Sequence, residues 1–226
     1  MSYEDVSALA EVLAKFDKGK EIASKRFEEK SATDHMTGLF NRRTFENRGG
    51  DFMAELYGQP ERQDQLRSVA IIFADIDHFK TVNDTYGHEP GDEVIKGVAQ
   101  VLKDGVRPGD LAVRLGGEEL LAILRNMTLE QAIAKAEELR KKIESLSFTD
   151  WSKDFKVTVS LGVALAERGK EQKKLGELLH DADAAMYDAK NSGRNQVKVY
   201  EKGVTPEKPK KEDKRIQGET ASPISE

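Results

Sequence analysis

The hydrophobic pattern predicts an apolar strand and a hairpin, each with carboxylates at one end. Residues 69–76 read Val-Ala-Ile-Ile-Phe-Ala-Asp-Ile, an almost continuous apolar run of strand length. Two further apolar runs, 111–115 and 120–124, flank Gly116-Gly117-Glu118-Glu119. Gly-Gly readily adopts the positive φ values that a tight turn needs. We therefore predict a hairpin over 111–124 that carries two adjacent carboxylates beside a glycine with no side chain to block a ligand.

Periodicity predicts several helices and two more strands. Apolar residues recur at a spacing of three to four in the helical segments. One helix opens at Thr128, where Gln131 completes a capping box. Residues 156–166 instead alternate as a strand does. The predicted elements, in order, are a turn at 33–41 leading into a helix through Tyr57, a loop at 58–67, the strand 69–76, a helix at 91–103, the hairpin 111–124, a helix from 128 to 146, a strand at 156–166, a helix at 175–190 and a strand at 196–200.

The order of these elements favours an α+β fold. Strictly alternating strands and helices would indicate a parallel, doubly wound sheet, whereas an internal hairpin indicates one sheet partly covered by helices. Residues 1–30 keep an apolar spacing of three to four, interrupted at Lys20. They are predicted to form a helix, which either packs on its own domain or acts as a dimerising stalk. Residues 201–226 hold half of the prolines and no aromatic residue, which indicates a disordered polar tail.

Composition narrows the classes of site and partner. The 226 residues fit one domain with extensions, or at most two small ones. The absence of cysteine excludes disulfides and thiolate zinc sites. No apolar run approaches the ~20 residues of a membrane span, and the N-terminus lacks the apolar core of a signal peptide, so a cytoplasmic protein without a membrane span is expected. A net charge of −5 argues against a general nucleic-acid binder but allows a nucleotide site, which needs only local cations.

Asp75 and Glu118 are candidate metal ligands. If their strands are neighbours, the two carboxylates form a hard-oxygen site of the kind that Mg²⁺ prefers when it also holds substrate phosphates. The alternative for Asp75 is a strand-end residue that caps a turn. Glu119 could deprotonate or position an attacking hydroxyl, or it could hold the hairpin by hydrogen bonds. The residues alone leave both roles of Glu119 open.

Seven short motifs stand along residues 31–200. They are Asp34-His-Met-Thr-Gly-Leu-Phe-Asn-Arg-Arg43, Asp75-Ile-Asp-His-Phe-Lys80, Asn83-Asp84, Gly87-His88 with Gly91-Asp92, Arg114-Leu-Gly-Gly-Glu-Glu119, Ser160-Leu-Gly162, and Ala182-Asp-Ala-Ala-Met-Tyr-Asp-Ala-Lys190 with Gly193-Arg-Asn195. In order and spacing these motifs resemble those of GGDEF domains. The resemblance implies a polymerase-palm-like α+β fold with a central, mainly antiparallel sheet flanked by helices. The catalytic members of this family are diguanylate cyclases, which join two GTP molecules into cyclic di-GMP and release two pyrophosphates.

The resemblance also implies roles for individual residues. Asp75, Glu118 and the carbonyl of Ile76 are the implied ligands of two Mg²⁺ ions per active site, which bind with GTP, and Mn²⁺ is an alternative ion. Asp75, Glu118 and Glu119 are the implied catalytic residues. A carboxylate accepts hydrogen bonds from guanine N1 and N2, which adenine cannot offer. The implied substrate-binding residues are Asn83 and Asp92 at the guanine, Lys80, Lys190 and Arg194 at the phosphates, the main-chain amides near His78 and Phe79, and Gly117.

Several of these contacts have a structural alternative. Asp92 could cap the helix at 91–103, and Asn83 could form a turn. Lys190 could be a cation at a helix C-terminus, and Arg194 could be a solvated surface charge.

Three further features follow from the resemblance. Asp34 and Arg114 are expected to pair and to fix the entry turn of the domain. Arg107-Pro-Gly-Asp110 is an R-x-x-D just before the hairpin, as in family members that their product inhibits, and the alternative is a charged turn. The signature ends in Leu120, where the family usually has Phe. That position should face the core, where a change of volume is tolerated.

The chain is therefore expected to be a cytoplasmic diguanylate cyclase with a helix at 1–30, one GGDEF domain at 31–200 and a tail at 201–226. Each domain binds one GTP, so catalysis needs two domains face to face and a homodimer is expected. The expected partners are GTP, cyclic di-GMP and a second copy of the chain, with no nucleic acid. The alternative is a catalytically weak GGDEF domain that acts as a receptor for cyclic di-GMP or GTP, or as an interaction module.

Overall fold

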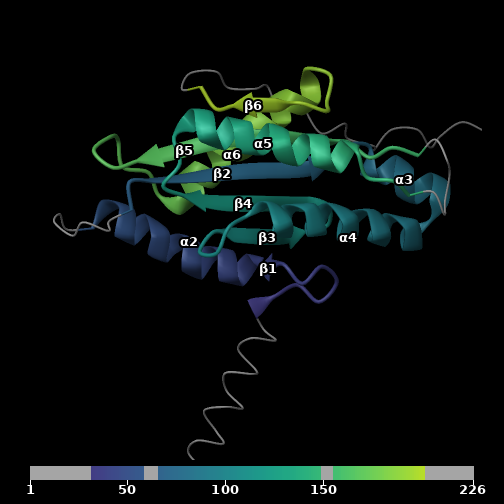
Figure 1. Cartoon of the computed structure of the whole chain (residues 1–226), viewed down its shortest axis with the longest axis horizontal. Helices are drawn as coiled ribbons and strands as arrows, with labels where there is room; N and C mark the ends of the chain where they lie inside the picture. Colours follow the sequence, from purple (N-terminus) through teal and green to yellow (C-terminus); the bar gives the residue numbers. More distant parts are fainter. Residues whose placement is uncertain (1–31, 59–65, 149–154, 202–226) are drawn as a thin grey trace, which may run out of the picture.

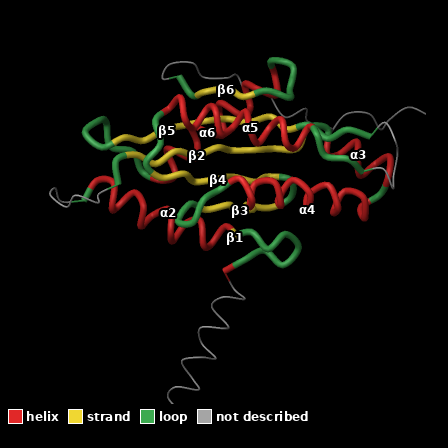
Figure 2. The backbone as a smooth tube through the Cα atoms, in the orientation of Figure 1, coloured by secondary structure: helices red, strands yellow, loops and turns green. Residues whose placement is uncertain are grey.

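The computed structural model describes residues 32–58, 66–148 and 155–201, in which six strands form one mixed sheet (Figure 1, Figure 2). In the order β1-β3-β4-β2-β5-β6, the three central pairs are antiparallel and the two edge pairs are parallel. The mainly antiparallel α+β fold is confirmed. The strands are β1 (Phe40–Asn41), β2 (Ser68–Ile76), β3 (Leu111–Gly116), β4 (Glu119–Arg125), β5 (Val159–Glu167) and β6 (Val197–Val199), and the helices are α2 (Arg42–Tyr57), α3 (Phe79–Tyr86), α4 (His88–Gly105), α5 (Leu129–Glu144) and α6 (Leu175–Asn191).

Helices cover both faces of the sheet, which explains why β2 is apolar almost throughout. Successive side chains of a strand point to opposite faces, and every residue of β2 is buried. Ala70 and Ile72 share a core with α4 and α5, whereas Ile71 and Phe73 share a core with α2 and α6. Figure 1 shows α4 and α5 lying along the same side of the sheet. Because β2 is packed on both faces, its end holds functional side chains in a fixed position.

β2 lies between β4 and β5, so the neighbour relationship expected for the two acidic segments is confirmed. Asp75 is opposite Glu119 on β4 and opposite Ser160 on β5. The predicted hairpin is formed by β3 and β4, with the turn at Gly116 and Gly117. Leu120 is fully buried, which confirms that this position faces the core.

The differences from the predicted elements lie at boundaries and in short pieces. α2, α6 and α5 with its Thr128 capping box are confirmed. α4 begins at His88 rather than at residue 91, because a proline, here Pro90, is tolerated in the first turn of a helix. The pattern predicts neither β1 nor α3, since β1 has two residues and α3 buries only Phe79 and Val82. β5 and β6 are shorter than predicted.

The helix predicted at 1–30 and residues 202–226 of the predicted tail lie outside the described residues. Within the described ranges, no helix has the length and apolar character needed to cross a membrane.

Candidate functional site

Asp75 stands at the end of β2, close to the end of α6. Its side chain is buried, and Lys190 Nζ lies 2.7 Å from its Oδ1. Burial raises the pKa of Asp75 to about 6. The hydrogen bond and charge of Lys190 oppose this rise, while the charges of Glu118 and Glu119 add to it. The turn-capping alternative is wrong, because the carboxylate pairs with a side chain of α6 rather than with the backbone of a turn.

Arg114 holds the turn between β3 and β4. Gly116 and Gly117 have φ of 151° and 54°, values that other residues rarely adopt. The space beside both glycines is open, because no described heavy atom would lie within 4 Å of a Cβ built at either. Arg114 Nε and Nη2 donate to Gly117 O at 3.0 and 2.8 Å, and Nη1 pairs with Asp34 at 3.0 Å. The expected Asp34–Arg114 pair is confirmed.

Glu118 and Glu119 are half-buried, and Arg114 donates two hydrogen bonds to the turn beside them. Glu119 borders a cavity of about 290 Å³ together with Arg42 and Asp183. Burial raises the pKa of Glu119, the charge of Asp183 adds to the rise, and Arg42 opposes it. Sequence reasoning missed Arg42 and Asp183 as neighbours of Glu119, although both lie inside motifs of the family.

The donor set at this edge of the sheet fits a hard divalent cation. Asp75 and Glu118 offer carboxylate oxygens, and Ile76, whose main-chain carbonyl is the third expected donor, is the last residue of β2. Among the described residues, no three acidic, histidine or cysteine side chains are arranged as a complete metal cage. The set therefore suits an ion that keeps several positions for water and phosphate oxygens, as Mg²⁺ does with nucleotides.

Asn83 on α3 and Asp92 on α4 flank Gly91. Asn83 Oδ1 is buried and has no hydrogen-bond partner among the described residues, and a Cβ at Gly91 would overlap it. Asp92 is the fifth residue of α4, so the capping alternative is wrong. Asn83 lies within α3, so the turn alternative is wrong too. A buried amide oxygen that lacks a donor suits the N–H groups of a guanine edge.

The expected phosphate-binding groups come from α3 and from the end of α6. His78 and Phe79 stand at the start of α3, where the first N–H groups of a helix have no partner within the helix. Lys80 is exposed on the same helix. Lys190 lies in the last turn of α6, so its reading as a cation at a helix C-terminus also holds. Arg194 is exposed in the turn that follows.

The R-x-x-D segment packs on β4, at the end away from Glu119. Asp110 is buried, accepts from Arg125 N at 3.0 Å and pairs with Arg107 Nε at 3.3 Å. Arg107 also donates to Arg125 O, and 54% of its side chain stays exposed. Asp110 therefore organises the turn, as the charged-turn reading expects, and Arg107 is the member that a ligand can reach.

Sequence reasoning also missed Asp77 and Asn195. Asp77 is buried, and its carboxylate accepts a hydrogen bond from Asn195 N at 3.0 Å. The signal was the position of Asp77 directly after an apolar strand, because a carboxylate buried there must find donors.

Comparison with known proteins identifies the family. Residues 31–196 match the family model described as "Diguanylate cyclase, GGDEF domain". Diguanylate cyclase A of Treponema denticola is 37% identical over 169 residues, which cover 75% of this chain and 44% of that protein. Probable diguanylate cyclase DgcT of Escherichia coli is 38% identical over 168 residues, which cover 74% of this chain and 35% of that protein. The chain thus spans less than half the length of these curated relatives.

Solved structures share the fold. The coiled coil and GGDEF domain of DgcB from Caulobacter crescentus, in complex with c-di-GMP, gives a TM-score of 0.72 at 29% identity, over 85% of this chain and 97% of that one. Diguanylate cyclase SiaD of Pseudomonas aeruginosa, in complex with its activator SiaC, gives a TM-score of 0.69 at 30% identity, over 87% of this chain and 72% of that one. Because the family model matches residues 31–196, which are most of this chain, the chain belongs to the GGDEF diguanylate cyclase family.

Proposed function

We propose that this chain is an active diguanylate cyclase, which condenses two GTP molecules into cyclic di-GMP and releases two pyrophosphates. The observation that carries the proposal is the meeting of Asp75, Glu119 and Lys190 at one edge of the sheet. Asp75 and Glu119 are opposite each other in the β2–β4 register, and Lys190 lies 2.7 Å from Asp75. Leu120 is fully buried in the core and is not itself one of these groups.

Asp75, Glu118 and the Ile76 carbonyl would hold two Mg²⁺ ions that bind with GTP. When bound, the ions neutralise triphosphate charge and align the attacking and leaving oxygens. Lys80, Lys190 and Arg194 add positive charge at the phosphates, and the amides at the start of α3 add N–H donors.

Asn83 and Asp92 select guanine. The carboxylate of Asp92 accepts from the N1–H and N2–H donors, and Asn83 Oδ1 gains the donor that it lacks among the described residues. Adenine presents an acceptor at N1, which faces a carboxylate unfavourably. A buried polar group that loses its partner costs about 1–3 kcal/mol, which is enough for clear discrimination.

Glu119 takes the proton of the attacking 3′-hydroxyl. A general base works best when its pKa approaches the working pH, and burial and Asp183 raise the pKa of Glu119 in that direction. The proton moves to Glu119 as the 3′-oxygen bonds to the α-phosphorus and pyrophosphate leaves. Each chain binds one GTP, so two chains act face to face as a homodimer in which each nucleotide attacks the other.

Feedback by the product at the R-x-x-D segment is part of the proposal. The planar guanidinium of Arg107 suits a phosphate or a guanine edge of cyclic di-GMP. Asp110 is buried against Arg125 and fixes the turn that presents Arg107. The exposed half of Arg107 supports this assignment.

Incubation of the purified protein with GTP and Mg²⁺ tests the proposed activity. Chromatography of the nucleotides should show cyclic di-GMP, and none should form without a divalent ion or with ATP in place of GTP. Binding of GTP or cyclic di-GMP without turnover would contradict the proposal and favour the receptor reading.

A further inference from the structure

Asp77 is a buried carboxylate with three hydrogen-bond donors around it. Its Oδ1 accepts from Ser160 Oγ at 2.7 Å, and its Oδ2 accepts from Thr158 Oγ1 at 2.8 Å and from Asn195 N at 3.0 Å. Hydrogen bonds to an ionised acceptor are shorter and stronger than neutral ones. Asp77 therefore ties the end of β2 to the start of β5 and to the turn after α6.

The turn after α6 has an uncommon backbone that is held from several sides. Arg194 and Asn195 have φ of 62° and 44°, and consecutive positive φ values are rare for residues other than glycine. Arg194 N donates to Ala189 O, which anchors the turn to α6. The bond from Asn195 N to Asp77 anchors it to β2. Such a backbone persists only where the surrounding structure determines it.

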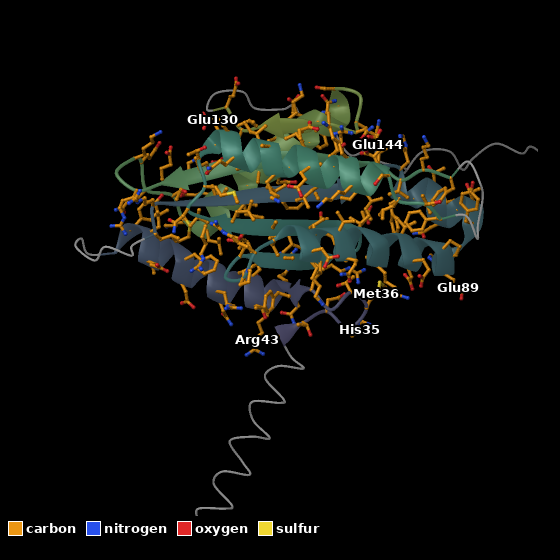
Figure 3. The ribbon with its side chains drawn as sticks, viewed as in Figure 1. His35, Met36, Arg43, Glu89, Glu130 and Glu144 are labelled. Atoms are coloured by element: carbon orange, nitrogen blue, oxygen red, sulfur yellow. The ribbon has the colours of Figure 1, made fainter. Side chains whose placement is uncertain are left out.

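The side chain of Asn195 adds a third anchor, on α5. Arg140 Nη1 donates to Asn195 Oδ1 at 2.7 Å, and Asn195 Nδ2 donates to Glu144 Oε1 at 2.8 Å. Arg140 is itself fixed by Glu137 at 2.9 Å and by Glu144 at 3.0 Å, and only 13% of its side chain is exposed. Figure 3 labels Glu144 on α5. The turn is thus joined to three elements of the fold, namely α6, the end of β2 and α5.

We propose that Asp77 and Asn195 are positioning residues for the phosphate-binding groups of this cyclase. They hold the turn that carries Arg194, and the end of α6 that carries Lys190, at a fixed place relative to Asp75. The inference rests on the proposed function, because it takes Asp75 as a metal ligand and the two cations as phosphate contacts. Neither Asp77 nor Asn195 touches the substrate.

The physical reason is the cost of ordering. A long cationic side chain on a mobile turn loses conformational freedom when it binds a phosphate, and that loss subtracts from affinity. A turn that is already fixed on β2, α5 and α6 loses little. The same bonds set the distance between cations and carboxylates, which determines whether the α-phosphorus lies in line with its attacker.

A role in stability alone predicts a different kinetic pattern. Loss of stability reduces the number of folded molecules, so the apparent kcat falls while KM for GTP stays the same. A displaced turn weakens the hold on the triphosphate in molecules that are folded, so KM and the Kd of a GTP analogue rise. The two roles therefore separate in the binding data.

Three substitutions in the full chain test the inference. Asn195→Gly removes both bonds to α5 and tolerates the positive φ. Ser192→Gly is its matched control, because it places a glycine in the same turn without touching Asp77 or α5. Asp77→Ala removes the acceptor itself. The measurements are KM and kcat for GTP, calorimetric Kd of a non-hydrolysable GTP analogue with Mg²⁺, and amide hydrogen exchange of residues 192–196.

Asn195→Gly should raise the Kd of the analogue about tenfold, raise KM similarly and speed exchange in the turn. Asp77→Ala should raise both values further, and Ser192→Gly should match the wild type. If Asp77→Ala does not fold, the Kd of the analogue for Asn195→Gly tests the inference by itself. An unchanged Kd in a folded Asn195→Gly protein overturns the inference, as does an equal rise in Ser192→Gly. If the wild-type protein makes no cyclic di-GMP, the proposed function fails instead, and the positioning claim fails with it.

Discussion

Lys190 in the last turn of α6 donates to Asp75 at the end of β2 across 2.7 Å. This one contact joins the helix end proposed to bind phosphate to the strand end proposed to bind metal. Burial outweighs the lysine, so the pKa of Asp75 stands at about 6 although an opposite charge is in contact. The charged form of Asp75 therefore lowers the stability of the folded protein, as expected of a carboxylate that binds a further cation in its functional state.

Asp75→Asn should stabilise the protein near neutral pH. The pKa of Asp75 in the folded protein, about 6, lies above the ordinary value of 3.8. Between these values the folded state binds more protons than the unfolded state, so the contribution of Asp75 to stability falls as pH rises through this window, and the cost is complete above it. The neutral amide escapes this cost, which is roughly 3 kcal/mol at most.

Urea unfolding of the wild type and Asp75→Asn across this pH window measures the effect. The advantage of the variant should grow with rising pH. Asp51→Asn, at an exposed position of α2, controls for the change in net charge. A difference in unfolding free energy that does not change with pH would contradict the assignment of a raised pKa to Asp75.

Glu118→Gln should abolish cyclic di-GMP formation and leave the fold intact. A neutral amide removes a ligand charge that the metal–triphosphate complex needs, whereas the turn itself is held by Arg114. Glu130→Gln is the matched control, since Glu130 is exposed at the start of α5 (Figure 3). The cyclase assay and far-ultraviolet circular dichroism are the measurements. A folded Glu118→Gln protein with wild-type activity would refute the metal assignment.

Gly91→Ala should weaken GTP binding. A Cβ at this position would overlap Asn83 Oδ1, so the amide proposed to face guanine must move. We expect a rise of about tenfold in KM for GTP, the equivalent of one lost hydrogen bond. Gly50→Ala on α2 meets no described atom within 4 Å and should leave KM unchanged. Equal KM values for Gly91→Ala and the wild type would exclude Asn83 from base recognition.

Asp92→Ser should erode the preference for GTP over ATP. The wild-type carboxylate pairs with two guanine donors and opposes the adenine acceptor. Its removal should reduce the ratio of kcat/KM for the two nucleotides by roughly one to two orders of magnitude. Competition assays with both nucleotides measure this ratio. Equal use of GTP and ATP by the wild-type protein would contradict the assignment of Asp92 to guanine recognition.

Arg107→Ala should relieve product inhibition while initial rates stay close to normal. The exposed part of Arg107 is the part available to cyclic di-GMP. Complete progress curves should run further toward GTP depletion in the variant, and calorimetry should show weaker binding of cyclic di-GMP. Asp110→Ala should instead lower the melting temperature, because it leaves Arg125 N without its acceptor. Wild-type curves that slow only through GTP depletion would identify the segment as an ordinary turn.

Local pattern predicts the parts of this fold whose signals are local. The hairpin at Gly116 and Gly117, the Thr128 capping box and the burial of Leu120 each depend on a few adjacent residues. α3 is missed because its eight residues bury only two apolar side chains, which is too weak a stripe to read as a helix.

Contacts between distant segments could not be predicted in the same way. The motifs place Asp75 and Lys190 in one site, but only the packing of α6 on the sheet brings Nζ and Oδ1 together. The hydrogen bond from Asn195 N to Asp77 joins residues 118 positions apart in the sequence. The turn that presents this amide has positive φ values at Arg194 and Asn195. The hydrophobic pattern cannot predict this bond, because its donor is a backbone amide and not a side chain that the sequence would single out.

The most direct test of the central claim is the simultaneous measurement of cyclic di-GMP and pyrophosphate from GTP and Mg²⁺ with the purified protein. We expect two pyrophosphates for each cyclic di-GMP, a specific activity that rises with protein concentration because two chains must meet, and no product from Glu118→Gln. Folded, nucleotide-binding protein that releases no pyrophosphate would contradict the claim that this chain is a cyclase.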